Sequence, residues 1–168
     1  MNIVLRNTTE LYFKTTLYRC ATGRGGIASK SAEGDGITPI GLLPIRKVLY
    51  RPDRLPAPHT RLPTAPLKQS DGWCDDPADP AYNRQISLPF SARHENLWRS
   101  DHVYDVIAIL GFNDSPVQPN KGSAIFLHIA RPDYQPTEGC IALAQHDLLD
   151  ILRHCDPKSQ VDITRPGL

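Results

Sequence analysis

The segment "GSAIFLHIA", residues 122–130, carries the strongest strand signal in the chain. Its apolar run is rich in residue types that favour β-structure, and a glycine precedes it. The segment "HVYDVIAILGFN" at 102–113 has the same character and lies just upstream, across the loop "DSPVQPNK". We therefore expect these two segments to be neighbouring strands of one sheet.

Other segments extend this pattern along the chain. Further strands are predicted for "ELYFKTTLYRC" at 10–20, "LLPIRKVLY" at 42–50 and "QVDIT" at 160–164. The segment "LAQHDLLDILRHC" at 143–155 has apolar residues at helical spacing and predicts a helix. The glycine-rich stretch at 21–41 holds turn signals and could form a hairpin. Together these segments predict a mostly-β single domain with one helix near the C-terminus.

Two stretches lack both strand and helix signals. Residues 51–68, "RPDRLPAPHTRLPTAPLK", hold five prolines, and proline cannot donate to a sheet ladder. This stretch is either a plain surface loop or a flap over a site. Residues 71–84, "DGWCDDPADPAYNR", are expected to be a second irregular stretch.

Length and charge limit the classes of partner. The 168 residues suit one domain, and the net charge of +1 without a long basic run argues against nucleic acid as a partner. The longest apolar runs are too short to span a bilayer, so no membrane span is expected. The N-terminal residues show no signal peptide. The protein therefore stays in the cytoplasm, or its signal has been removed. We expect a monomer.

The four cysteines show no metal or redox motif. They are Cys20, Cys74, Cys140 and Cys155, and no CxxC pair occurs among them. Neither a zinc ribbon nor a thioredoxin-type site is indicated, and no metal or other cofactor is expected. A disulfide among Cys20, Cys74 and Cys155 is possible, but spacing does not define a pair.

The segment "PTEGCIAL" at 136–143 places Cys140 after Gly139, twelve residues beyond His128. Three roles are open for Cys140: a buried structural thiol, a metal ligand, or a nucleophile with His128 as its base. A free thiol has a pKa of about 8.5, so it needs a base to become a good nucleophile at neutral pH. Glycine allows close backbone approach, so the N–H groups at 139–140 could stabilise an oxyanion.

Two separated motifs resemble one known family. The segment "FLHIARPDYQPTEGCIAL" and the "KSAEGDGITPIGLLPI" segment at 30–45 resemble the signatures of the YkuD-type L,D-transpeptidases, over residues 10–165. The resemblance implies a single YkuD-like β-rich domain with sandwich-like or barrel-like mixed sheets, and a C-terminal helix near the active site. The domain would span 1–168, with the proline-rich loop or flap at 51–68.

The resemblance implies a cysteine acyltransferase that acts on peptidoglycan. Cys140 matches the nucleophile, His128 the general base and Gly139 the backbone turn of the oxyanion site. The chain departs from the family where Glu138 replaces a second histidine, and where Ala142 stands in place of an arginine or asparagine. Both departures affect substrate recognition rather than the nucleophile. Candidate substrate-binding residues are Thr137, Glu138, Arg131, Tyr134 and Trp98.

Several outcomes of the chemistry stay open at this stage. The partners implied are peptidoglycan stem peptides, as donor and acceptor, in the cell envelope. The favoured product is a 3–3 crosslink, and a 1–3 crosslink from an L-Ala donor is the alternative. With water as the acceptor the enzyme would be an L,D-carboxypeptidase. A third alternative, outside the enzymes, is a peptidoglycan-binding domain that has lost its catalytic activity.

Overall fold

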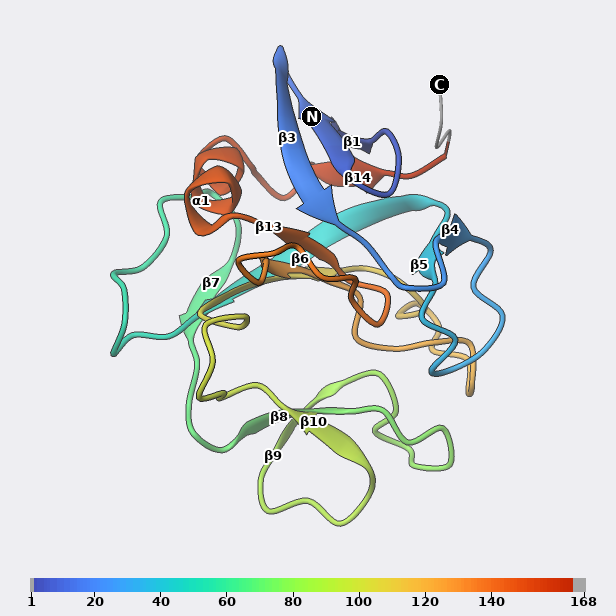
Figure 1. Ribbon diagram of the computed structural model, residues 1–168. Helices are drawn as coiled ribbons and strands as arrows, with labels where there is room; N and C mark the ends of the chain where they lie inside the picture. Colours follow the sequence, from blue (N-terminus) through green and yellow to red (C-terminus); the bar gives the residue numbers. More distant parts are fainter. Residues whose placement is uncertain (1, 165–168) are drawn as a thin grey trace.

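An eight-stranded β-barrel forms the centre of the molecule in the computed structural model, which describes residues 2–164 (Figure 1). The sheet closes because β6 pairs with β11 on one side and with β14 on the other. In spatial order the barrel strands are β11 (Val106–Leu110), β12 (Phe126–Ile129), β13 (Ile141–Leu143), β3 (Thr16–Ala21), β2 (Glu10–Phe13), β1 (Asn2–Leu5), β14 (Gln160–Asp162) and β6 (Leu42–Tyr50).

The barrel sheet is mixed. β12 pairs in parallel with β13, and β1 pairs in parallel with β14, while the other barrel pairs are antiparallel. β11 and β12 are antiparallel neighbours, which confirms the pairing expected from their sequences. β1 lies between β2 and β14, so the barrel also includes residues 2–5.

The strands β11, β12 and β13 are buried on both faces, which explains their nearly continuous apolar sequences. Alternate side chains point to opposite faces of a strand. One set fills the barrel: Val106, Ala108, Leu110, Leu127, Ile129, Ile141 and Leu143. Residues of the other set, including Ile107, Ile109 and Phe126, belong to a second apolar cluster outside the barrel.

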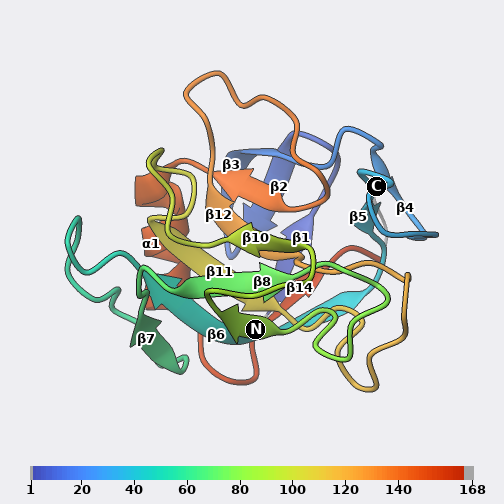
Figure 2. The ribbon, with the colours of Figure 1, turned by 90° about the horizontal axis from the view of Figure 1, so that it is seen from below.

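A small antiparallel sheet covers this outer cluster. It consists of β8 (Asp71–Cys74), β9 (Gln85–Ser87) and β10 (His94–Asn96), with β8 in the middle. Figure 2 shows β8 and β10 lying across β11. The Trp73 ring of β8 packs edge-on against Phe126 of β12, with 5.1 Å between ring centroids. The molecule therefore has a second layer on the outside of the barrel wall that carries His128.

The helix α1 (Gln145–Arg153) follows β13 directly and packs against β12. Its buried residues Leu148, Ile151 and Leu152 join the apolar cluster inside the barrel. The helix therefore supports the strand that carries His128 from the inner side. The fold class predicted from the sequence, a mostly-β domain with mixed sheets and a helix near the C-terminus, is confirmed.

Two connecting stretches differ from the sequence expectation. Within residues 21–41, β4 (Ile27–Ala28) and β5 (Thr38–Pro39) pair in parallel, so the hairpin prediction was wrong. Within residues 51–68, β7 (Thr64–Pro66) pairs in parallel with β6. Two of the five prolines lie at its edge, where the missing N–H is tolerated.

Strand boundaries also differ from the prediction. The segment 10–20 is two strands joined by a turn in which Lys14 has φ 54°. No glycine or proline marks this turn, so the sequence pattern did not reveal it. The segment 71–84 was expected to be irregular, yet it opens with β8. The strands expected at 102–113 and 122–130 are shorter: β11 begins at Val106 after a turn and ends at Leu110, and β12 covers only Phe126–Ile129.

All four cysteines are free and buried, so the disulfide considered from the sequence is absent from residues 2–164. Burial raises the pKa of Cys20 to about 12 and that of Cys155 to about 11. Both thiols behave as small apolar groups inside the fold.

The barrel interior predicts a clear mutational contrast. Leu127→Ala removes a side chain with no exposed surface, and such a cavity should destabilise the fold by about 2–5 kcal/mol. Leu17→Ala removes a side chain that is 53% exposed and should change stability by less than about 0.5 kcal/mol. Urea unfolding followed by circular dichroism measures both. Equal effects would show that the β12 side chain does not hold the core.

Candidate active site

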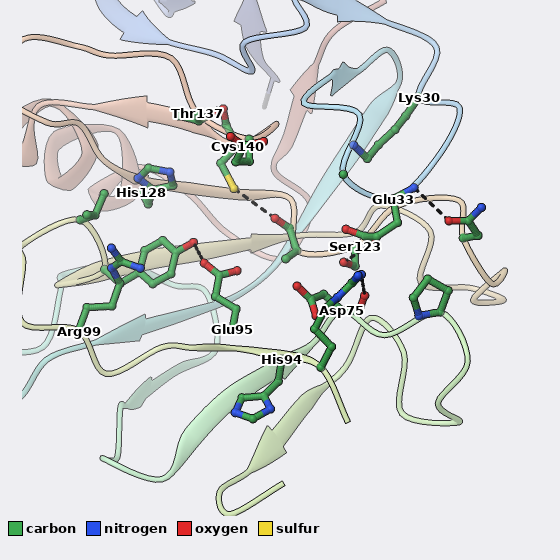
Figure 3. Close-up of a pocket in the computed structure, with 18 of the residues that line it drawn as sticks. Lys30, Glu33, Asp75, His94, Glu95, Arg99, Ser123, His128, Thr137 and Cys140 are labelled. Atoms are coloured by element: carbon green, nitrogen blue, oxygen red, sulfur yellow. Dashed lines mark hydrogen bonds and ion pairs between the residues drawn. The ribbon is translucent and has the colours of Figure 1, made fainter. Parts of the chain in front are cut away.

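A cavity of about 640 Å³ lies where the outer barrel wall meets the second layer, and it contains both Cys140 and His128 (Figure 3). The barrel side of this cavity is formed by β12 and by the turn before β13. The facing side includes Glu95 of β10 and Tyr104. Lys30, Glu33, Gly34 and Ser123 complete one end.

Cys140 is the last residue before β13 and its side chain is only 8% exposed. Its Sγ donates to the Ala124 carbonyl oxygen at 3.1 Å and accepts from the Phe126 N–H at 3.4 Å. Burial, and then the negative charge of Glu95, raise the pKa of the thiol to about 12. At rest Cys140 is therefore a neutral thiol.

His128 lies on the same outer face as Cys140. The parallel register pairs His128 with Ala142, and Cys140 is two residues before Ala142, so both side chains leave the sheet on one side. Nδ1 of His128 is 3.0 Å from the Ile129 carbonyl oxygen. Because a carbonyl only accepts, Nδ1 carries the proton of the neutral ring, and Nε2 keeps its lone pair.

The His128 ring is neutral at rest. Burial lowers its pKa to about 4; the hydrogen bond to Ile129 opposes this shift, and the nearby Arg131 and Arg99 add to it. The ring also packs edge-on against Tyr104, with 5.4 Å between centroids. His128 makes no hydrogen bond to Cys140 within residues 2–164. The structure therefore holds an uncharged thiol and an uncharged base in one cavity, rather than an ion pair.

The turn before Cys140 requires glycine. Gly139 has φ 136°, and an added Cβ would lie 2.8 Å from the Ile37 carbonyl oxygen. The Gly139 N–H donates to Oγ1 of Thr137 at 3.1 Å, and that hydroxyl donates to the Cys140 carbonyl at 2.6 Å. The Cys140 N–H has no acceptor within the described residues. Of the two N–H groups considered for an oxyanion site, only that of Cys140 is free.

The segment at 30–39 holds this turn from the other side. The buried hydroxyl of Thr38 accepts from the Gly23 N–H and donates to the Gly139 carbonyl at 2.9 Å. The Lys30 ammonium lies 2.5 Å from Asp35. Burial alone would raise the pKa of Asp35, but Lys30 and backbone N–H groups outweigh it and lower that pKa. The "EGDGITP" residues therefore build the support of the Cys140 turn. Sequence reasoning noticed this motif but assigned no role to Thr38, Lys30 or Asp35.

The residues expected to bind substrate separate into two groups. Thr137, Glu138 and Arg131 line the cavity. Trp98 and Tyr134 do not: the Arg51 guanidinium stacks on Trp98 at 3.7 Å, and Arg19 stacks on Tyr134 at 4.2 Å.

Ion pairs distinguish the charged side chains of the cavity. Glu138 is at the rim, 2.9 Å from Arg24, and both side chains are mostly exposed. Arg99 pairs with Asp101 at 2.6 Å, and Arg93 pairs with Asp75 at 3.0 Å. Within residues 2–164 the Arg131 guanidinium forms neither a hydrogen bond nor an ion pair with another side chain. Arg131 is therefore the cation of this cavity that is available to an anionic group.

Sequence reasoning missed several residues that line the cavity, among them Glu33, Glu95 and Tyr104. Glu33 lies in the recognised "EGDGITP" motif, so a signal existed for it. Glu95 and Tyr104 lie in segments without any motif, and only the packing of the second layer brings them to Cys140. Two other histidines are less suitable as bases, since His94 points away from the thiol in Figure 3 and His146 is exposed on α1.

The described residues hold no group of three histidine, cysteine or acidic side chains that could bind a metal ion. Nor does any helix between residues 2 and 164 have the length and apolar character needed to cross a membrane.

Comparison with known proteins gives one match. The family model YkuD, described as the L,D-transpeptidase catalytic domain, matches residues 3–163. That range includes every strand of the barrel, the second layer and the Cys140 turn. Neither a curated protein nor a solved structure matched the chain.

Burial of neutral His128 predicts a pH-dependent stability. Its pKa is lowered to about 4 in the fold, so below its usual value the unfolded chain binds the proton first, and stability falls as the pH drops. Between pH 7 and 4.5 the wild type should lose about 2 kcal/mol more than His128→Asn. Urea unfolding at both pH values measures this difference. Equal losses would show that His128 is not buried as a neutral base.

Proposed function

The chain belongs to the family of YkuD L,D-transpeptidase catalytic domains, and from this premise we propose that it is a peptidoglycan L,D-transpeptidase that uses Cys140 as its nucleophile. One observation carries the assignment: the Cys140 thiol and the lone pair of His128 Nε2 come from the same face of adjacent strands and line one cavity. A base held on β12 and a nucleophile held by the turn that leads into β13 are the minimum for acyl transfer.

In the first step His128 takes the thiol proton while the sulfur attacks the donor carbonyl. The free N–H of Cys140 stabilises the oxyanion that develops there. The imidazolium then gives its proton to the leaving amine, and a thioester on Cys140 remains. Because both groups are neutral at rest, charge separates only when the substrate is in place. Burial keeps the unused thiol unreactive.

In the second step an amine of another stem peptide attacks the thioester. The C–N bond forms while His128 takes a proton from the attacking amine, the C–S bond breaks, and the thiolate recovers that proton from His128. The proposed donor and acceptor are both stem peptides of peptidoglycan. We therefore propose that the enzyme acts in the cell envelope.

We propose that Arg131 binds a carboxylate group of the donor peptide. It lines the cavity beside His128 and has no ion-pair partner among the described residues. It takes the role left open by Ala142, which is buried in β13 and carries no charge. Glu138 is bound to Arg24 at the rim, so it belongs to the edge of the site rather than to its chemistry.

The proposal predicts a covalent adduct on Cys140. Incubation with a carbapenem should add one ligand mass to the protein, and Cys140→Ala should abolish the adduct because the other three cysteines are buried away from the cavity. Intact mass spectrometry measures it. An adduct that persists in Cys140→Ala would assign the nucleophile to another residue.

The proposal also predicts which bond of the donor stem peptide is cut. We expect attack after the third, diamino residue and a 3–3 crosslink. Tandem mass spectrometry of dimers made by the purified protein identifies the linkage. A dimer joined through L-Ala, with the rest of the donor stem released, would replace this expectation with the 1–3 reaction. A shortened monomer alone would identify an L,D-carboxypeptidase.

A further inference from the structure

Glu95 occupies a special position in the cavity. It is the central residue of β10, and the register places it directly opposite Trp73 of β8. Opposite residues share a face of a sheet, so Glu95 and Trp73 both point toward the barrel, where Trp73 meets Phe126. Figure 3 shows the Glu95 carboxyl group below Cys140, beside the ring whose hydroxyl it binds.

One oxygen of Glu95 is free. The Tyr104 hydroxyl donates to Oε1, and Oε2 has no hydrogen-bond partner within residues 2–164. In the same range no fully buried side-chain oxygen lacks a partner, so Oε2 must be open to solvent, and Glu95 lines the cavity. The carboxyl group therefore presents an unused acceptor to whatever enters.

The other carboxyl groups of the cavity are occupied or further away. Asp75 pairs with Arg93 and Glu138 pairs with Arg24. Glu33 accepts from the hydroxyls of Tyr82 and Ser123. Glu33 and Glu95 both have only neutral partners, but of these two only Glu95 contributes to raising the pKa of Cys140. Its charge therefore acts close to the reacting sulfur.

A carboxylate so close to the thiol opposes the attack of Cys140 on the donor, because its negative charge disfavours the thiolate. The same charge stabilises a positively charged group of a ligand. The acceptor of the second step is an amine, which is an ammonium ion at neutral pH and must lose a proton before it can attack. An unpaired carboxylate beside the thioester can bind the ammonium ion and can also accept its proton.

Building on the proposed function, we propose that Glu95 binds the ammonium group of the acceptor and removes its proton, and so selects an amine over water. The ammonium transfers one proton to Oε2 and becomes a free amine. The amine attacks the thioester carbonyl, and the tetrahedral intermediate passes a second proton to His128. The Cys140 thiolate leaves and recovers that proton from His128, and the Glu95 carboxylic acid releases the first proton to solvent.

The environment of Glu95 suits this role. Burial raises the pKa of its carboxyl group, although the Tyr104 hydrogen bond and Arg99 oppose the shift. A carboxylate with a raised pKa is a stronger proton acceptor near neutral pH. The Tyr104 hydroxyl fixes Oε1, so the free Oε2 has one orientation toward the cavity.

The ratio of crosslinked dimer to hydrolysed donor tests the proposal. Purified wild type, Glu95→Gln and the matched control Glu10→Gln, whose side chain lies outside the cavity, are incubated with one stem-peptide fragment, and both products are quantified by mass spectrometry. Glu95→Gln should lower the ratio at least tenfold. Its carbapenem adduct should form at least as fast as in the wild type, since a negative charge near the thiol is gone. Glu10→Gln should keep the wild-type ratio.

Each other outcome overturns the proposal. A ratio within twofold of wild type in Glu95→Gln, or an equal fall in Glu10→Gln, would remove the special role of Glu95. Slower acylation of Glu95→Gln by the donor peptide, with an unchanged ratio, would assign Glu95 to the donor. A wild type that never acylates would overturn the proposed function itself. If Glu95→Gln forms no carbapenem adduct, Glu95→Ala takes its place, and a wild-type ratio there overturns the inference.

Discussion

The parallel pairing of β12 with β13 is the constraint on which the site depends. It places His128 level with Ala142 and therefore puts Cys140 on the same face of the sheet. A shift of one residue would turn Cys140 into the barrel interior, because side chains alternate between faces. The register is held by Leu127, Ile129, Ile141 and Leu143, whose side chains fill the barrel. Packing inside the barrel thus determines the chemistry outside it.

The turn that delivers Cys140 to this strand is fixed by segments distant in sequence. Thr38 binds the Gly139 carbonyl, and Gly23 forms a bridge with Thr137. The buried Lys30–Asp35 pair holds the segment that carries Thr38. Breaking one partner of such a pair leaves an uncompensated buried charge, which costs about 3–5 kcal/mol. Residues without contact to a substrate therefore control the position of the nucleophile.

Burial shifts the pKa values of Cys140 and His128 in opposite directions, and both shifts favour the uncharged form. The pKa of Cys140 rises to about 12, and the pKa of His128 falls to about 4. A charge inside this cavity is costly until another charge or hydrogen-bond donor accompanies it. The available groups for that purpose are the Arg131 guanidinium and the Glu95 carboxylate, one of each sign. The cavity is therefore suited to ligands that carry both an anionic and a cationic group.

The sequence by itself determined the strands around His128, the mostly-β class with one helix, and the Gly139-Cys140 turn, because these depend on local residue types and period. It also contained the two motifs that identify the family. Only the tertiary structure decided that Glu95 and Tyr104 join the site and that Trp98 and Tyr134 do not. These placements follow from how the second layer packs on the barrel, and such long-range contacts leave no periodic signal in the chain. The turn at Lys14 was missed because no glycine or proline marks it, and the parallel β4–β5 pair was missed because turn signals in the sequence do not distinguish it from a hairpin.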